Sequence, residues 1–216
     1  MAVAKKRKKF FDAEIPLIGK STQLLAFEIE ELADRRIKYD LTRMQRGKNI
    51  LLDAVVEIKD KIAVAHPVKI YLLPSYLKRM VRKGTNYVED SFDAETTDGI
   101  VRIKPFLVTR RKVSRAVRKA LRNKAKEELL SYAKVGTILN IFTEVLNNNM
   151  QKTLSAKLKK IYPLSTCEIR ILEVKKRTKA PKESKEKKIV KEKIVEEVKE
   201  ETPKEIKEAP EKEKKE

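Results

Sequence analysis

The sequence contains few of the side chains on which most enzyme active sites depend. Its 216 residues include one cysteine, one histidine, five glycines and no tryptophan. A single cysteine, Cys167, cannot form a disulfide within the chain, so nothing indicates an oxidising compartment. Thiolate and imidazole metal sites need more ligands than this, and the glycines are too far apart for a phosphate-binding loop. The sequence therefore predicts no catalytic residues, no metal and no cofactor.

Long apolar runs are also missing. No run reaches the roughly 20 residues of a helix that spans a bilayer. The basic N-terminus is not followed by the apolar segment of a signal peptide. We therefore expect a cytoplasmic protein with no membrane partner and no small-molecule substrate.

The two rare reactive residues fit structural roles. His66 lies in a strand-like run and shares its alternating face with Ile62, Val64 and Val68. A partly buried strand histidine is favoured over a catalytic one. Cys167 lies between apolar and polar strand positions, where a thiol packs rather than reacts.

Acidic residues are absent from a long stretch, Gly99 to Lys126, which carries eleven basic ones. The whole chain has a net charge of +20 and a pI near 9.9. Like charges repel, so such a cluster indicates an anionic partner, and nucleic acid is the first candidate. The eleven residues are Arg102, Lys104, Arg110, Arg111, Lys112, Arg115, Arg118, Lys119, Arg122, Lys124 and Lys126.

The first half of the chain has the period of two that is typical of strands with one buried face. Four runs share this pattern: Leu25-Phe27-Ile29, Ile37-Tyr39-Leu41, Ile50-Leu52-Ala54-Val56-Ile58, and Ile62-Val64-Val68-Ile70-Leu72. A helix is expected from Pro74 towards Gly84, and a strand over 87–96. The Asp98-Gly99 pair predicts a tight hairpin turn into a strand over 100–108.

After Thr109 the apolar spacing becomes helical. Three helices are predicted from the stripes Val113-Ala116-Val117-Ala120-Leu121-Ala125, Ile138-Ile141-Phe142-Val145-Leu146 and Met150-Leu154-Leu158-Ile161. A last strand over 166–174, with Cys167, Ile169 and Ile171 on one face, rejoins the sheet. The expected fold class is α+β, a mostly antiparallel sheet with three to four helices.

Three segments are expected along the chain. Residues 1–9 form a basic arm that includes Lys5, Lys6, Arg7, Lys8 and Lys9, and residues 10–174 form a single RNA-binding domain. Residues 175–216 contain 16 basic and 12 acidic residues and no aromatic one. The few apolar side chains of this segment cannot offset the conformational entropy that ordering would cost. A disordered tail is therefore predicted.

The basic residues after Thr109 are ordered along one side of the predicted helix. Lys112, Arg115, Lys119, Arg122 and Lys126 recur every three or four residues, over roughly 21 Å at 1.5 Å per residue. A solvated helix face normally mixes charge signs, and this one does not. No base-reading motif accompanies it, which favours phosphate and shape contacts with structured RNA. The arm and all eleven basic residues are the candidate RNA-binding residues.

Several segments, taken in order, resemble the archaeal and eukaryotic small-subunit ribosomal protein family called eS-one, with the older name S-three-A-e. They are Phe10-Phe11-Asp12-Ala13-Glu14-Ile15-Pro16, Thr96-Thr97-Asp98-Gly99 with Arg102, Thr109-Arg110-Arg111, and Ile161-Tyr162-Pro163-Leu164 followed by Lys175-Lys176. The resemblance implies a structural protein of the small ribosomal subunit, bound to ribosomal RNA beside other ribosomal proteins. It also implies a curved or barrel-like sheet, and the short N-terminal arm favours an archaeal source.

Two other functions are compatible with the residues alone. The runner-up is a non-ribosomal RNA- or DNA-binding protein, such as an RNA chaperone, which the basic charge also fits. A nuclease that uses carboxylates and Mg²⁺ needs clustered acids, whereas the acids here mostly alternate with apolar strand residues.

Overall fold

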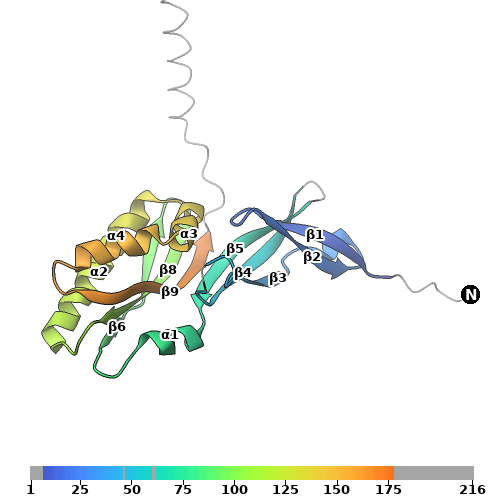
Figure 1. The fold of residues 1–216 in the computed structure, drawn as a ribbon. Helices are drawn as coiled ribbons and strands as arrows, with labels where there is room; N and C mark the ends of the chain where they lie inside the picture. Colours follow the sequence, from blue (N-terminus) through green and yellow to red (C-terminus); the bar gives the residue numbers. More distant parts are fainter. Residues whose placement is uncertain (1–6, 46, 60–61, 178–216) are drawn as a thin grey trace, which may run out of the picture. The chain divides into compact units, whose positions relative to one another are not determined.

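The structure is a computed structural model that describes residues 7–45, 47–59 and 62–177 (Figure 1). Its strands are β1 (Lys9–Ile15), β2 (Lys20–Ala26), β3 (Arg36–Asp40), β4 (Ile50–Lys59), β5 (Ile62–Leu72), β6 (Tyr87–Glu89), β7 (Phe92–Thr96), β8 (Gly99–Thr109) and β9 (Leu164–Arg177). Its helices are α1 (Pro74–Met80), α2 (Arg115–Val135), α3 (Ile138–Leu146) and α4 (Asn149–Leu158), with a 3-10 helix η1 (Ile29–Leu32).

All nine strands belong to one sheet, which confirms the α+β class. Its main path runs β2-β1-β5-β9-β8-β6, with β4 also paired to β5, β3 to β4 and β7 to β8. Every pairing is antiparallel except the short one between β1 and β5, where Ala13 lies opposite Ala63. Among the described residues the path does not close, so the sheet is open rather than a barrel.

The last strand, β9, lies in the middle of the sheet. It pairs with β8 from Leu164 to Arg177 and with β5 around Leu172. In the described sheet it is the link between the N-terminal strands and the strands β6 to β8. The prediction of a closing strand is therefore confirmed, and the strand extends three residues beyond Val174 to Arg177. The rest of the predicted tail, 178–216, lies outside the described residues.

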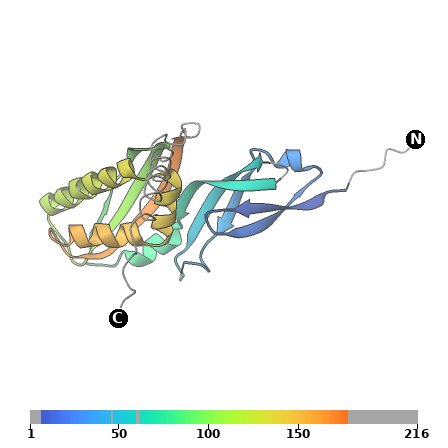
Figure 2. The ribbon, with the colours of Figure 1, turned by 90° about the horizontal axis from the view of Figure 1, so that it is seen from above.

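Helices α2, α3 and α4 gather over the part of the sheet formed by β6 to β9 (Figures 1 and 2). Helix α2 packs on β7, α4 packs on β9, and α4 contacts both other helices. The apolar side of α3 is buried along its length, and Thr137 caps it by accepting a hydrogen bond from the backbone of Asn140. Leu121, Ala125 and Leu129 of α2 face the same core.

Two predicted strand faces are wrong in part. In β5, Ala63, Ala65 and Ile70 are buried, whereas Ile62 is half exposed. The register against β4 shifts between Asp53 and Ala54, so an extra residue of β5 exchanges the two faces midway. An alternation of buried and exposed residues is shifted by one at such a bulge. Only the second half of the buried face predicted for β5 is therefore correct.

The predicted strand around Leu25 to Ile29 ends early. Strand β2 stops at Ala26, and Ile29 begins the 3-10 helix. Ala26 is the buried residue, while Leu25 and Phe27 are 41% and 37% exposed. The larger side chains were assigned to the core, but the sheet places the smaller one there.

The apolar stripe predicted for α2 is correct in part: Leu121 and Ala125 are buried and Val117 packs against the core. Ala116 and Ala120 are exposed, and the buried positions Leu121, Ala125 and Leu129 recur every four residues. Alanine fits either environment, so its position in the pattern was uninformative. The correct side follows from the leucines.

The hairpin between β7 and β8 is confirmed, with a shifted loop. Thr96 pairs with Gly99, so Thr97 and Asp98 form the two-residue loop. The predicted single strand over 87–96 is divided into β6 and β7 by Asp90 and Ser91. Gly99 is required for another reason: its φ is +154°, and an added Cβ would lie 2.1 Å from the backbone oxygen of Lys176.

Cys167 packs in β9 as expected. Its side chain is buried, and burial raises the pKa of its thiol to about 12. The nucleophilic thiolate is therefore scarce at physiological pH.

We expect the substitution Gly99→Ala to lower the free energy of unfolding by about 3 kcal/mol, because the new methyl group collides with the backbone of β9. Gly84→Ala is the matched control. Its φ is also positive, but no atom lies within 4 Å, so about 1 kcal/mol of backbone strain is expected. Urea unfolding measures both; equal losses would contradict the steric explanation.

The Cys167 thiol of the folded chain should react with a thiol reagent far more slowly at pH 8 than the thiol of the urea-unfolded chain. Burial limits both access and ionisation. The rate of Ellman's reagent measures this directly. Equal rates in the two states would show that the thiol is open to solvent.

Candidate nucleic-acid interface

The densest group of free basic residues lies at the start of α2. Ser114 caps the helix by accepting a hydrogen bond from the backbone of Val117 at 3.4 Å. The preceding loop exposes Arg110, Arg111 and Lys112 to solvent. Within the first two turns, Arg115, Lys119 and Arg122 are also exposed. The predicted cationic side of this helix is therefore present as a surface.

The basic side of α2 borders a hollow of about 410 Å³ against β6. Its lining consists of Tyr87, Val88, Arg115, Arg118, Lys119, Arg122 and Asn123. The Nε of Arg118 is buried there, and no described residue accepts a hydrogen bond from it. A buried donor without a partner is costly, and an anionic oxygen satisfies it. The hollow thus has the charge and the donors that a phosphate requires.

An aromatic ring stands beside these cations. Tyr87 is 54% exposed, and its ring stacks on that of Phe106 at 5.9 Å between centroids. Sequence reasoning assigned Tyr87 only to a strand, and it missed Asn123 as well. Tyr87 reaches the site only through the packing of β6 on α2, which no signal in the sequence could have shown, whereas Asn123 follows Arg122 in the predicted helix.

The structure does not bring all eleven predicted residues together. Phe92 and Ile103 face the helices, and the Nζ of Lys126 lies 6.0 Å from the ring centroid of Phe92. Arg102 and Lys104 alternate with these buried positions in β8, so they lie on the opposite face of the sheet. The acid-free stretch therefore divides into two surfaces.

Arg102 has a partner within the chain. Its Nε lies 2.6 Å from Oδ1 of Asp93, and a second nitrogen donates to Oδ2 at 2.8 Å. This bidentate hydrogen bonding raises the pKa of Arg102 and lowers the pKa of Asp93. The guanidinium is committed to the sheet, so it offers less to an external anion than the free cations of α2.

The pair between Arg102 and Asp93 belongs to a longer row of charges. Six strands place residues of alternating sign directly opposite one another on this face: Lys38, Asp53, Lys69, Glu173, Arg102 and Asp93. Opposite charges across neighbouring strands stabilise the pairing. The row explains why a basic residue of β8 has a structural role.

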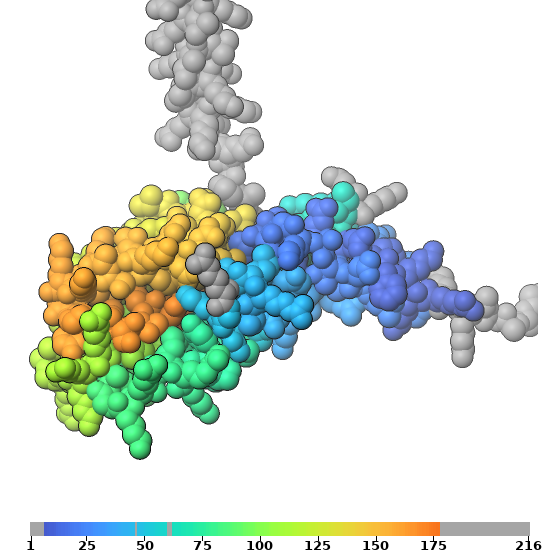
Figure 3. Space-filling model, viewed as in Figure 1, coloured from blue at the N-terminus to red at the C-terminus, as the bar shows by residue number. Residues whose placement is uncertain are grey.

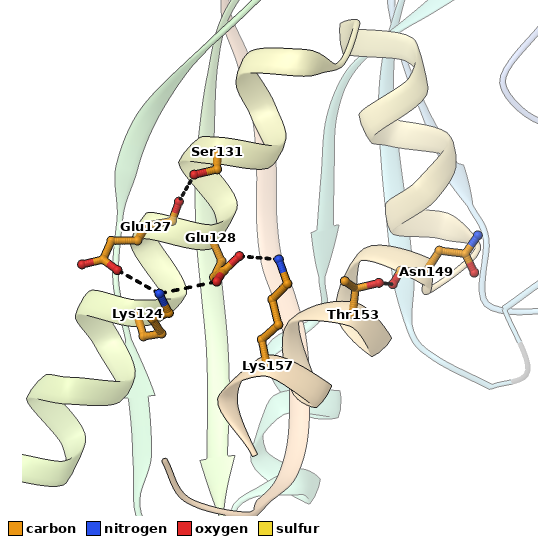
Figure 4. Close-up of polar contacts among 7 residues, drawn as sticks. All are labelled: Lys124, Glu127, Glu128, Ser131, Asn149, Thr153 and Lys157. Atoms are coloured by element: carbon orange, nitrogen blue, oxygen red, sulfur yellow. Dashed lines mark hydrogen bonds and ion pairs between the residues drawn. The ribbon is translucent and has the colours of Figure 1, made fainter. Parts of the chain in front are cut away.

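The basic surface of α2 ends where its first acids appear (Figure 4). Lys124 lies 3.3 Å from Glu127 and 3.6 Å from Glu128, and these contacts raise the pKa of the lysine. Lys157 of α4 donates to Glu128 at 2.6 Å and lowers the pKa of that carboxyl. These ion pairs join α2 to α4 and remove Lys124 from the set of free cations.

The predicted basic arm is only partly described, because Lys5 and Lys6 lie outside the described residues. Arg7 and Lys8 precede β1, and Lys9 is its first residue; all three are exposed. The Nζ of Lys8 lies 5.4 Å from the ring centroid of Phe27. The described end of the arm, Arg7 to Lys9, thus lies at the β1–β2 edge of the sheet.

His66 is a partly buried residue of β5, as expected. Its Nε2 lies 3.3 Å from a carboxylate oxygen of Glu57, and its side chain is 18% exposed. Burial lowers the pKa of the imidazole, with Glu57 opposing the shift. The described residues contain no group of three or more potential metal ligands. They also contain no helix that is both long and apolar enough to cross a membrane.

Comparison with known proteins gives a consistent result. The profile of the Ribosomal S3Ae family matches residues 4–178. The small ribosomal subunit protein eS1 of Nanoarchaeum equitans is 27% identical over 73% of this chain and 84% of its own length. The protein of the same name from Pyrobaculum neutrophilum is 30% identical over 69% of each chain. That of Halorubrum lacusprofundi is 27% identical over 72% of this chain and 74% of its own.

Proposed function

The chain belongs to the Ribosomal S3Ae family, and from this we propose that it is a structural component of the small ribosomal subunit. In this role it binds ribosomal RNA through phosphate and shape contacts, beside other ribosomal proteins on the cytoplasmic ribosome. The names of its relatives support the ribosomal assignment. The observation that carries RNA binding is the cationic hollow of α2 with the unpartnered Arg118 Nε.

Charge neutralisation supplies the binding free energy in this proposal. None of Arg115, Lys119 and Arg122 forms an ion pair with a described residue. Their mutual repulsion is relieved when phosphates approach, and the counterions released from the RNA make binding depend on salt. The cations project from a rigid helix, so RNA binding has to order only their own side chains and not the backbone that carries them.

Shape rather than base sequence governs the contact at α2. The basic side chains are long and solvent-exposed, which suits phosphate positions along a folded RNA better than base edges. Arginine dominates in the hollow, and its planar fork binds phosphate oxygens in pairs. Tyr87 adds one exposed ring on which an unpaired base can stack.

The other basic residues take different parts in the proposal. Arg110, Arg111 and Lys112 extend the surface of α2, and the arm from Lys5 to Lys9 makes a second contact with RNA. Lys104 lies on the opposite face of the sheet from α2, and Lys126 lies 6.0 Å from the ring centroid of Phe92. Arg102 and Lys124 contribute mainly through their ion pairs with Asp93, Glu127 and Glu128. No residue is assigned to catalysis.

A tagged copy of the chain, produced in an archaeal host, should sediment with the small ribosomal subunit on a sucrose gradient at moderate salt. The tagged chain should stay in the small-subunit peak after polysomes are dissociated into subunits, because a structural component is not released with messenger RNA. A chain that remains at the top of the gradient would contradict the proposal and favour a non-ribosomal nucleic-acid-binding protein.

Changing Arg115, Arg118 and Arg122 together to Gln should weaken binding to structured ribosomal RNA. The slope of log affinity against log salt should flatten by about 2 to 3 units, since each phosphate contact contributes slightly less than one. Filter binding over a salt series measures both quantities.

The matched control removes the same charge elsewhere, with Lys20, Arg36 and Lys78 changed to Gln. These residues lie on β2, β3 and α1. The control should lose less affinity and keep a steeper slope. An equal effect of the two triple variants would mean that net charge, and not the surface of α2, determines binding.

A further inference from the structure

A second hollow lies where the loop between β3 and β4 meets α4 and the start of β9. Its volume is about 600 Å³. Figure 3 shows this side of the molecule, where light-blue residues near position 50 adjoin the orange segment of α4 and β9. Residues far apart in the sequence therefore line one pocket.

One wall of the pocket is a nearly buried charged group. The Nζ of Lys48 lies 2.5 Å from Oε1 of Glu168 and 2.6 Å from Oδ1 of Asn148. The side chain of Glu168 is only 10% exposed. Asn148 has a left-handed backbone, with φ of 60°. Burial of such a pair is costly, so its place in a pocket wall suggests use as well as stability.

The other wall holds a polar group without a partner. Gln151 is 6% exposed, and its Nε2 donates to the backbone oxygen of Val145 at 2.8 Å. That bond fixes the amide, and Oε1 is buried with no described hydrogen-bond donor. Because a buried acceptor without a donor destabilises the fold, a ligand that donates to it is favoured.

The rim of the pocket is basic. Lys152 of α4 and Lys159, which caps the end of that helix, both line it and both are exposed, with Ser155 between them. Neither lysine forms an ion pair with a described residue. The pocket thus combines a cationic mouth with a floor that mainly accepts hydrogen bonds.

We propose that this pocket holds a single guanine nucleotide that is extruded from folded RNA. The base would donate from N1 and its exocyclic amine to Glu168 and Gln151 Oε1, and its O6 would accept from Lys48. A carboxylate has about four lone-pair positions, so Glu168 accepts from the base while it is paired with Lys48. The phosphates on either side of the base lie at Lys152 and Lys159.

Other classes of ligand fit less well. A free phosphate would meet the acceptors of Glu168 and Gln151 at the floor, and a metal cation would meet Lys48. Unpaired bases in RNA are commonly read through hydrogen bonds at their Watson–Crick edge, which matches the acceptor-rich floor. The inference rests on the proposed RNA binding and names a second, base-selective contact beyond the phosphate contacts of α2.

The test uses the full chain and three RNA hairpins that differ at one position: a bulged guanosine, a bulged inosine and no bulge. Inosine lacks only the exocyclic amine. The wild-type chain should bind the guanosine hairpin about tenfold more tightly than the inosine hairpin, as expected for the loss of one buried hydrogen bond. Fluorescence anisotropy measures the three affinities.

Two variants locate the effect. Gln151→Leu keeps the volume and helix preference, and Val145 O retains a hydrogen bond from the backbone of Asn148. It should bind the guanosine and inosine hairpins equally. Changing Lys152 and Lys159 to Gln at the exposed rim should weaken binding to both bulged hairpins without altering their ratio.

The outcomes separate this inference from the proposed function. If the wild-type chain binds all three hairpins equally, or Gln151→Leu keeps the preference for guanosine, the pocket does not hold a guanine and RNA binding by α2 stands. The triple Gln variant of α2 should weaken binding to all three hairpins alike. A chain that binds none of the RNAs overturns both proposals.

Discussion

The position of β9 between β5 and β8 is the constraint on which the rest of the structure depends. Without it, the sheet of β1 to β5 has no described pairing with β6 to β8. The pairing of β9 with β8 brings the backbone of Lys176 so close to Gly99 that no side chain fits at position 99. It also places Glu168 within reach of Lys48, 120 positions earlier in the chain. Such pairings cost loop-closure entropy, so the apolar surface buried under α2 and α4 must offset it.

The fold sorts a uniform run of positive charge into distinct roles. In β8, Arg102 lies opposite acids of both neighbouring strands and is one member of an alternating row. At the end of α2, Glu127 and Glu128 pair with Lys124 and Lys157. The loop and the first turns of α2 keep several cations that form no ion pair with a described residue, as do Lys152 and Lys159 beside the second hollow. The start of α2 is therefore a surface of unpaired positive charge, where a polyanion relieves the repulsion.

Local patterns predicted the elements better than the faces they present. The helices from Pro74, Ile138 and Asn149 and the hairpin before Gly99 were evident, because caps, turns and apolar spacing act over a few residues. The bulge in β5 was not, since it arises between two strands rather than within one. The exposed Leu25 and the buried Ala26 show the same limit: a side chain's own hydrophobicity does not determine which side of a strand is covered.

The sequence by itself determined the α+β class, the positions of most elements, the basic side of α2 and the family, because each follows from composition or from residues close in the chain. Only the tertiary structure decided which cations are free. Arg102 and Arg118 are alike in the sequence, yet one is bound by Asp93 and the other has a buried nitrogen without a partner. The cause is physical: charge is neutralised or left available by neighbours in space, and those neighbours come from strands and helices that the sequence separates.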